Sequence, residues 1–375
     1  MTVATRPHVL VDMLFWTGTK GGIETYAREL YSALRDTDRF TFTALASTEF
    51  AASDPTWFPG RVVDSGISGN IAGLNRLRWS WAELQGVSRW ADRLHADLIH
   101  CPSLLGPRAS RVPTVVSMHD LLYWTNPEHM PSQVFVKPAQ WMESMVAKNA
   151  TRMITISQSS ARDIDRYLKF PRERLDIIPL AGSVRESAAR LRTGSTPENM
   201  ILATGNRLGH KNWGSLIRAL PLVPEDVRPR LVVTGSKGDD PLIPIVQETG
   251  MQDWVDLRGW VTNDEMDRLL ASAGALAIPS FHDGFCLPAL DAMLIGLPVL
   301  LSDIPVYREV GGDAAIYVDP HSLESIAEGM TVVATDPERM RRAAELGLAQ
   351  AARFSWESTA ARTLDVFDEA LAPSA

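Results

Sequence analysis

Residues 281–293 read Phe-His-Asp-Gly-Phe-Cys-Leu-Pro-Ala-Leu-Asp-Ala-Met and lie between two apolar runs. The run before them, 275–279, has the length of a strand, and Pro288 suits the first turn of a helix because an N–H there has no helical partner. A strand, a glycine-bearing loop and a helix in this order aim the free N–H groups of the helix beyond the edge of the sheet. The sequence therefore predicts an anion site at this junction.

Two carboxylates flank the junction, Asp283 in the loop and Asp291 in the helix. An acid beside a phosphate would repel it, so we expect these carboxylates to accept hydrogen bonds from the neutral hydroxyls of a sugar or a ribose. The alternative is an ordinary loop, in which an acid near a helix N-terminus is favoured by the helix dipole alone. This segment by itself does not decide between the two interpretations.

With 375 residues the chain is longer than one typical domain, so two domains of similar size are expected. A content of 45% hydrophobic and 22% charged residues is typical of a globular protein, and the formal net charge of -8 argues against a nucleic-acid-binding protein. Cys101 and Cys286 form no Cys-x-x-Cys pattern, which favours reduced thiols. No export signal or membrane-spanning apolar run is visible, and we therefore expect a cytoplasmic protein.

Apolar runs alternate with helical patterns along both halves of the chain. Runs of strand length occur at 9–15, 112–118, 153–156, 200–204 and 231–234. The alternation predicts two α/β domains with parallel sheets facing one another, and ligands in the cleft between the carboxyl edges of the sheets. Residues 181–199 are polar and aperiodic, which predicts a linker between a first domain at 1–180 and a second domain at 200–354.

Other predicted strands also end in loops that could bind a ligand. Gly21 and Gly22 follow the first strand in a pattern that matches no phosphate-binding fingerprint and indicates only a close approach of ligand or backbone. His119 directly follows a buried strand, although a hydrogen-bonded histidine in an ordinary loop is the alternative. Arg207 and Lys211 occupy a glycine loop, where they could clamp a diphosphate or remain solvated.

Residues 74–94 predict a helix that carries three tryptophans and four arginines. In an acidic protein this composition would suit a surface that rests on the inner, anionic face of a membrane or meets a lipid-linked acceptor. The alternative places the tryptophans in the core and the arginines in solvent. The periodicity is not cleanly one-faced, which favours this alternative.

Matching pieces of a known family occur in order along nearly the whole chain. They are 21–26, 119–121, 205–212, 258–261, 279–298, 304–310 and 354–356. Each piece alone is weak, but together they resemble the family 4 retaining glycosyltransferases of the GT-B fold. The resemblance implies two Rossmann-like parallel-sheet domains facing a central cleft, an acceptor-side first domain, a nucleotide-sugar-binding second domain, and a C-terminal helix, 355–375, that crosses back to the first domain.

The resemblance also implies an activity. A hexose or deoxyhexose would move from a GDP-, dTDP- or UDP-sugar to a hydroxyl acceptor, in the synthesis of a polysaccharide, a glycolipid or a secondary-metabolite glycoside. The acceptor would be a carbohydrate, a lipid-linked sugar or a small molecule. No cofactor and no metal ion are expected, because preorganised cations and helix dipoles can stabilise the charge that accumulates on the leaving diphosphate.

Each catalytic position receives a role from the resemblance. His119 would lie beside the transferred sugar, whose hydroxyls Asp283 would hold, and Arg207 and Lys211 would neutralise the diphosphate. The donor-binding positions would be Gly21 and Gly22 at the diphosphate, Gly259, Trp260 and Val261 at the nucleobase, Asp291 at the ribose, and Gly284, Phe285, Cys286 and Leu287 in the loop along sugar and phosphate.

Three positions depart from the family pattern. The family usually has glutamates where this chain has Asp283 and Asp291, and it commonly has glycine at the position of Cys286. Each aspartate is one methylene shorter than glutamate, which shortens its reach by about 1.5 Å. The departure leaves the donor sugar and its base open. A non-catalytic nucleotide-binding relative is the alternative function, and an epimerase on the same twin-domain fold has no support in the donor-loop residues.

Overall fold

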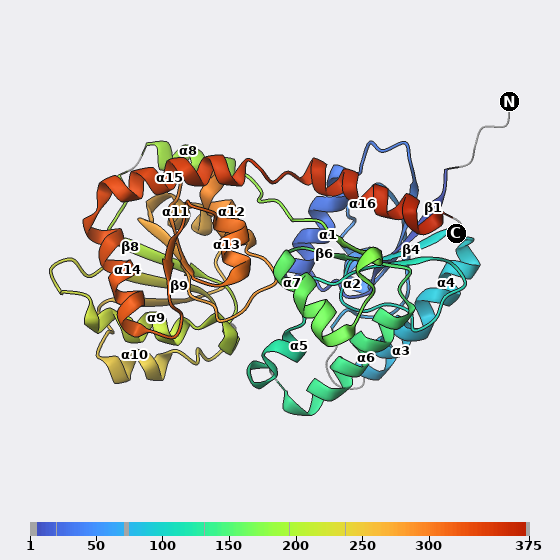
Figure 1. Ribbon diagram of the computed structural model, residues 1–375, viewed down its shortest axis with the longest axis horizontal. Helices are drawn as coiled ribbons and strands as arrows, with labels where there is room; N and C mark the ends of the chain where they lie inside the picture. Colours follow the sequence, from blue (N-terminus) through green and yellow to red (C-terminus); the bar gives the residue numbers. More distant parts are fainter. Residues whose placement is uncertain are drawn as a thin grey trace. The chain divides into compact units, whose positions relative to one another are not determined.

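The computed structural model describes residues 6–19, 21–70, 75–130, 132–194, 196–236 and 238–372. Contacts within the chain divide it into two compact units, each a sheet covered by helices (Figure 1). Unit 1 comprises Met1–Trp124, Val134–Leu180 and Ser355–Ala375, and unit 2 comprises Thr125–Gln133 and Ala181–Phe354.

In the described residues, unit 1 forms a seven-stranded parallel sheet in the order β3-β2-β1-β4-β5-β6-β7. Its strands are β1 (His8–Met13), β2 (Thr41–Ala46), β3 (Gly60–Asp64), β4 (Leu98–Cys101), β5 (Thr114–Ser117), β6 (Arg152–Thr155) and β7 (Leu175–Ile177). The inner strands β4 and β5 are buried at every position, as parallel strands are when helices cover both faces of a sheet.

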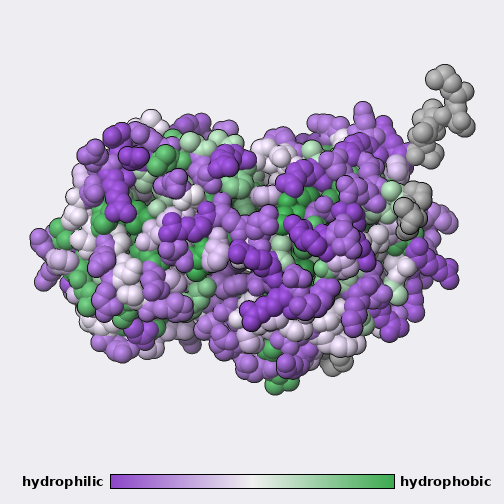
Figure 2. Space-filling model, viewed as in Figure 1, coloured by the Kyte–Doolittle hydropathy of each residue, from purple (hydrophilic) through white to green (hydrophobic). Residues whose placement is uncertain are grey.

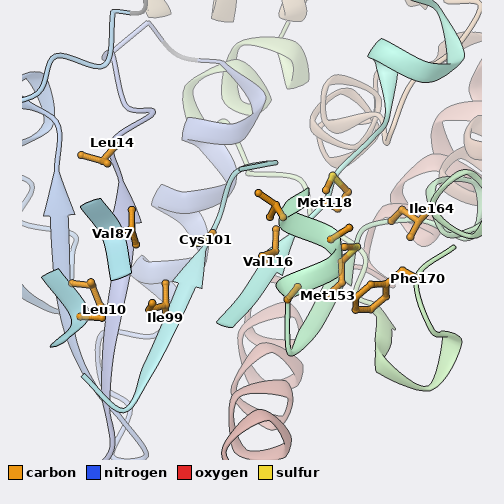
Figure 3. Close-up of a cluster of buried hydrophobic side chains, with 14 of the residues drawn as sticks. Leu10, Leu14, Val87, Ile99, Cys101, Val116, Met118, Met153, Ile164 and Phe170 are labelled. Carbon is orange, nitrogen blue, oxygen red and sulfur yellow. The ribbon is translucent and has the colours of Figure 1, made fainter. Parts of the chain in front are cut away.

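The helices of unit 1 pack on this sheet. They include α1 (Gly22–Ala33), α2 (Thr48–Ala52), α3 (Asn75–Trp81), α4 (Val87–Leu94), α5 (Leu122–Thr125), α6 (Val136–Asn149), α7 (Gln158–Asp163) and α16 (Trp356–Leu371). Figure 3 shows part of the core, in which Leu10, Ile99, Val116 and Met153 come from four different strands and belong to one buried cluster. This core holds the strand ends of unit 1 in fixed positions.

The predicted helix over 74–94 is present in its described part, residues 75–94. It is interrupted by one π-helical turn, Ala82–Gly86, between α3 and α4. Trp79 is buried and its indole N–H donates to the carbonyl of Leu14 (3.1 Å), whereas Trp81 is 54% exposed and lies under the guanidinium of Arg89. The tryptophans therefore divide between the core and the surface, because Trp79 and Trp81 are two residues apart in α3 and such residues point to opposite sides of a helix.

In its described residues, unit 2 forms a six-stranded parallel sheet in the order β10-β9-β8-β11-β12-β13. Its strands are β8 (Met200–Thr204), β9 (Arg230–Ser236), β10 (Val255–Gly259), β11 (Ala275–Ile278), β12 (Val299–Ser302) and β13 (Ile316–Val318). Its helices include α8 (Glu186–Thr193), α9 (Trp213–Ala219), α10 (Ile243–Thr249), α11 (Asn263–Ser272), α12 (Leu287–Leu294), α13 (Pro305–Gly311), α14 (Leu323–Thr335) and α15 (Pro337–Ala351). Two Rossmann-like parallel sheets confirm the predicted fold class.

Helix α8 lies inside residues 181–199, the segment that the sequence predicts as a linker, and this segment groups with unit 2. The guanidinium of Arg192 donates to the carbonyl of Ala273 (2.8 Å). Arg192, one of the polar residues of 181–199, thus provides a hydrogen-bond donor for a main-chain carbonyl of a neighbouring segment.

Residues 125–133 lie within the predicted first domain, 1–180, but group with unit 2. The ring of His129 stacks on that of Phe281, with centroids 6.0 Å apart and an interplanar angle of 12°. A Cβ at Gly209 would lie 2.6 Å from Nδ1 of His129, so only glycine leaves room for the imidazole. Apolar periodicity carries no signal for this contact.

Helix α16 belongs to the C-terminal segment that we expected to return to the first domain, and it packs within unit 1. The ring of Phe367 meets that of Phe40 edge-on, with centroids 5.6 Å apart. The guanidinium of Arg362 donates to the carbonyl of Ile177 at the end of β7 (2.6 Å). Apolar and polar contacts together hold the last helix on the sheet of unit 1.

Candidate functional site

The junction of β11 and α12 forms as the sequence predicts. The strand is Ala275–Ile278, the helix is Leu287–Leu294, and Pro288 occupies its first turn. Pro288 has no N–H, and the N–H groups of Ala289 and Leu290 both donate to the carbonyl of Cys286 (3.1 and 3.3 Å), so the start of α12 acts on the loop that carries Asp283 through the positive end of the helix dipole.

Asp283 is the centre of a small polar cluster in this loop. One of its oxygens, Oδ2, accepts from Nζ of Lys211 (2.6 Å) and from the hydroxyl of Tyr307 (2.9 Å), and Oδ1 accepts from the N–H of Gly284 (3.2 Å). The side chains of Lys211 and Asp283 are about one-fifth exposed, at 20% and 19%. The structure thus brings these two predicted residues together as an ion pair that solvent can reach.

Tyr307 was not among the predicted site residues, although it lies in one of the family-like segments. Burial, followed by the nearby Asp283 carboxylate, raises the pKa of Tyr307 well above its ordinary value, so the phenol stays a neutral donor. Burial is also the main reason that the pKa of the Cys286 thiol rises to about 12. Cys286 is therefore a protonated thiol beneath the loop and not a nucleophile at neutral pH.

Arg207 lies apart from this cluster, in a buried pair with Asp240. Its Nε donates to both carboxylate oxygens (3.1 and 3.0 Å) and its Nη2 to Oδ2 (2.8 Å), and the two side chains are 7% and 9% exposed. Its remaining donors meet carbonyls, among them those of Thr234 (2.8 Å) and Val233 (3.1 Å). Burial opposes ionisation of Asp240, but the bonds from Arg207 and the N–H of Leu242 outweigh it and lower the pKa of that carboxyl.

The predicted cation pair is therefore divided, with Lys211 on Asp283 and Arg207 on Asp240. A role of Arg207 at a diphosphate stays a prediction, and it would require these buried bonds to be exchanged for new ones. Asp240 was missed because it follows Arg207 by 33 residues and carries no motif.

Asp291 projects from α12 and accepts a hydrogen bond from the main-chain N–H of Ser183 (2.7 Å). Next to it, a Cβ at Gly182 would lie 2.9 Å from Cβ of Leu290, so glycine permits the close approach of this segment to α12. Asp291, which we predicted to bind a ribose, thus also holds the segment around Ser183 against α12.

The residue that follows β8 and the next-to-last residue of β9 both require glycine. Gly205 has φ +144° and Gly235 has φ +98°, and a Cβ at Gly235 would lie 2.4 Å from the carbonyl oxygen of Gly205. The predicted nucleobase segment follows β10 nearby in the same sheet: Gly259 ends the strand, and Trp260 is 50% exposed. Val261, which is partly buried, follows it toward α11.

In unit 1 the glycine loop leads into α1, whose N-cap is Gly21. Oε1 of Glu24 accepts from the N–H of Thr17 (2.7 Å) and from that of Gly18 (3.1 Å), which closes the loop over the helix start. A Cβ at Gly21 or Gly22 would meet no described atom within 4 Å. Packing among the described residues of unit 1 therefore does not require glycine at these two positions.

His119 lies directly beyond β5. It is buried, its ring meets that of Tyr26 edge-on with centroids 4.5 Å apart, and its carbonyl accepts from the hydroxyl of Ser160 (2.8 Å). Burial lowers the pKa of His119 to about 4, so the imidazole is neutral at physiological pH. Its Nε2 has no hydrogen-bond partner among the described residues, which leaves one ring nitrogen for a ligand.

Two wider features complete the picture. Within the described residues, no group of three or more histidine, cysteine or acidic side chains is placed to hold a metal ion. None of the helices in the described part of the chain has the length and apolar character needed to cross a membrane.

Family profiles match both halves of the chain. "Glycosyltransferase Family 4" matches residues 20–181 and "Glycosyl transferases group 1" matches residues 188–348. The O-antigen chain mannosyltransferase B of Escherichia coli is 30% identical over 74% of this chain and 76% of its own length. The MMP alpha-(1->4)-mannosyltransferase of Mycolicibacterium hassiacum is 28% identical over 74% of this chain and 71% of its own length.

Solved structures agree in fold over almost the whole chain. Sucrose-phosphate synthase from Thermosynechococcus elongatus superimposes with a TM-score of 0.76, at 18% identity, over 99% of this chain and 100% of that one. HepE from Anabaena, solved in complex with UDP and glucose, superimposes with a TM-score of 0.72, at 17% identity, over 97% and 100%. These findings confirm the resemblance seen in the sequence: the chain is a glycosyltransferase, and it belongs to glycosyltransferase family 4 with the GT-B fold.

Proposed function

We propose that this glycosyltransferase moves a hexose, with mannose as the first candidate, from a nucleotide-diphosphate sugar to a hydroxyl of a carbohydrate acceptor, with retention of anomeric configuration and without a metal ion. The observation that carries the proposal is the Lys211–Asp283 ion pair beside the first turn of α12. Mannose is supported by the names of relatives, which include several mannosyltransferases.

In this proposal, negative charge accumulates on the diphosphate as the bond to the sugar breaks. The ammonium of Lys211 and the positive end of the α12 dipole are fixed before the reaction, so they would stabilise that charge without reorganisation. The acceptor hydroxyl attacks the face from which the diphosphate leaves, and its proton passes to the departing phosphate oxygen. No side chain acts as a covalent nucleophile, and Cys286 is unsuited to that role because its thiol is protonated.

Asp283 and His119 would hold the transferred sugar. Because a carboxylate has about four acceptor sites, Asp283 can accept from a sugar hydroxyl while Lys211 stays bound to it. The buried Nε2 of His119 can pair with one further hydroxyl, and because the imidazole is neutral it offers either an N–H or a lone pair, according to its tautomer. Gly21 and Gly22 leave open space that a diphosphate could approach.

A donor panel tests the proposal. The protein is incubated with GDP-, UDP- and dTDP-sugars and with simple glycoside acceptors, and the release of nucleoside diphosphate and the anomeric configuration of the product are measured. We expect one donor to dominate, a product with the donor's configuration, and loss of turnover in Asp283→Ala with the fold retained. An inverted product, or unchanged turnover in Asp283→Ala, would contradict the mechanism.

A non-catalytic nucleotide-binding relative is the second candidate. Two observations favour it: the aspartates at 283 and 291 are shorter than the family's usual glutamates, and the donors of Arg207 are occupied by Asp240 and by carbonyls. Calorimetry separates the two candidates. This second function predicts nucleotide binding without product from any donor.

We also propose that unit 1 contacts an anionic membrane surface through residues 75–94. Two arginines of this helical segment lie over tryptophans, Arg89 over Trp81 at 5.0 Å and Arg93 over Trp90 at 5.4 Å. Such pairs place apolar rings and positive charge on the same surface, as interfacial helices do. Vesicle binding that is unaffected by anionic lipid or by salt would rule the contact out.

A further inference from the structure

A small pocket in unit 1 has no role in the proposed transfer. Its volume is about 170 Å³. Its walls include Trp79 of α3, Leu104 and Leu105 after β4, Tyr123 of α5, and Met142 and Glu143 of α6. Among the described lining residues Glu143 supplies the only carboxyl, so the pocket is an apolar space with one acidic group.

Glu143 is held in a defined position. The carboxyl is 2% exposed, and its Oε2 accepts from the indole N–H of Trp124 (2.7 Å). Burial is the main cause that raises the pKa of Glu143 to about 8, with the nearby Asp120 acting in the same direction. At neutral pH the group is therefore mostly an uncharged acid that can donate one hydrogen bond.

The helices that line the pocket are connected to the loop that carries His119. Helix α5 begins three residues after His119, and two hydrogen bonds join it to α6: Trp124 to Glu143, and Gln140 Nε2 to the carbonyl of Tyr123 (2.7 Å). Figure 1 shows α3, α5 and α6 close together in unit 1, in agreement with the shared lining of the pocket. A group bound here would lie beside the acceptor-side loop of the enzyme.

Apolar side chains continue outward from the pocket. Phe135 lines it and is partly exposed, and Val134, the residue before it, is more exposed still. Figure 2 shows hydrophobic residues at the lower edge of the visible face, over the start of α6. An occupant larger than the pocket could therefore extend along this surface without losing apolar contact.

We propose that this pocket binds the apolar aglycone of the acceptor, an aromatic or short aliphatic group attached to the sugar that receives the glycosyl residue. The inference rests on the proposed function. An apolar cavity of about 150 Å³ is large enough for benzene, so the volume suits one ring or a chain of about six carbons. A phosphate in this place would meet an acid and an apolar wall, which excludes a charged linkage as the occupant.

The test compares phenyl glycosides with methyl glycosides of mannose, glucose and galactose by titration calorimetry, with and without the nucleotide that binds best in the donor panel. For at least one sugar we expect the phenyl glycoside to bind about tenfold more tightly or better. Ala139→Phe, which fills the pocket from α6, should abolish this preference. Lys148→Phe, at an exposed position of the same helix, should preserve it.

Leu104→Trp fills the pocket from the opposite wall and keeps the test decisive if Ala139→Phe does not fold. Equal binding of phenyl and methyl glycosides for all three sugars would overturn the proposal, and so would a phenyl preference that survives in a folded pocket-filling variant. The assay needs no turnover. A protein that prefers phenyl glycosides but transfers no sugar would refute the proposed function alone, whereas an active enzyme indifferent to the aglycone would refute the pocket alone.

Discussion

Unit 2 holds the charged residues of its candidate site in ion pairs, whereas unit 1 keeps the polar residues of its own neutral by burial. Arg207 and Lys211 are each bound to an aspartate. His119 and Glu143 are buried. Burial lowers the pKa of His119 to about 4 and raises the pKa of Glu143 to about 8, so both side chains are mostly uncharged at neutral pH. The difference matches the proposed tasks, because a diphosphate needs fixed positive charge and a sugar or aglycone needs neutral hydrogen-bonding groups.

The largest effect is expected from the buried Arg207–Asp240 pair. Asp240→Ala leaves the guanidinium of Arg207 buried without its carboxylate, and we expect the free energy of unfolding of unit 2 to fall by about 3–5 kcal/mol. Urea denaturation followed by circular dichroism measures the change. Asp303→Ala is the matched control, because it removes the acid of an Arg–Asp pair that is half exposed. That variant should lose less than about 1 kcal/mol. Equal losses would show that burial does not distinguish the two pairs.

Lys211→Ala tests the second pair through catalysis. It removes a cation that is fixed before the reaction, so kcat/KM with the preferred donor should fall by about 10²–10³, which corresponds to roughly 3–4 kcal/mol. Arg218→Ala removes an exposed cation of the same unit, whose partner Glu248 lies 3.5 Å away, and should leave the rate unchanged. Similar losses in both variants would mean that Lys211 acts only through the net charge of unit 2.

Glu143→Gln tests whether the buried Glu143 of unit 1 is uncharged, through the pH dependence of stability. The pKa of Glu143 is higher in the folded protein than its ordinary value of 4.5, so the folded state retains a proton that the unfolded state has lost. Stability from this group is greatest at low pH and is lost as pH rises toward about 8. Between pH 6 and pH 8 the wild-type protein should lose about 2 kcal/mol more unfolding free energy than the variant. Asp12, with a pKa raised by burial to about 6, contributes to both proteins and cancels. Identical pH slopes would contradict a neutral Glu143.

The smallest effect concerns the membrane contact. Arg89→Ala should weaken binding to anionic vesicles at low salt about fivefold, because one basic residue near such a surface contributes about 1 kcal/mol. Arg341→Ala, at an exposed position of unit 2, serves as the control. Co-sedimentation with vesicles of phosphatidylcholine and phosphatidylserine gives the measurement. If the two variants bind alike, the surface of residues 75–94 is not the one that meets the lipid.

The helix and strand that carry the site could be predicted from the sequence, but the partners of its charged side chains could not. The bounds of α12 and the strand before it follow from an apolar run, a glycine loop and Pro288, all within one short segment. The partners Asp240 and Tyr307 could not be inferred in this way. They lie 33 residues from Arg207 and 24 residues from Asp283; Asp240 has no pattern of its own, and the family-like segment around Tyr307 does not reveal which residue Tyr307 contacts.

By itself, the sequence determined the family, the alternation of strands and helices in two parallel sheets, and the strand ends at which the site residues stand. These depend on periodicity and on loop chemistry, which act over a few residues. Only the tertiary structure decided which charges pair, that residues 125–133 join unit 2, and that Glu143 is buried in an apolar pocket. The physical reason is that pairing and burial depend on which distant segments the folded sheets bring into contact, and the energies of those contacts are not encoded by neighbours in the chain.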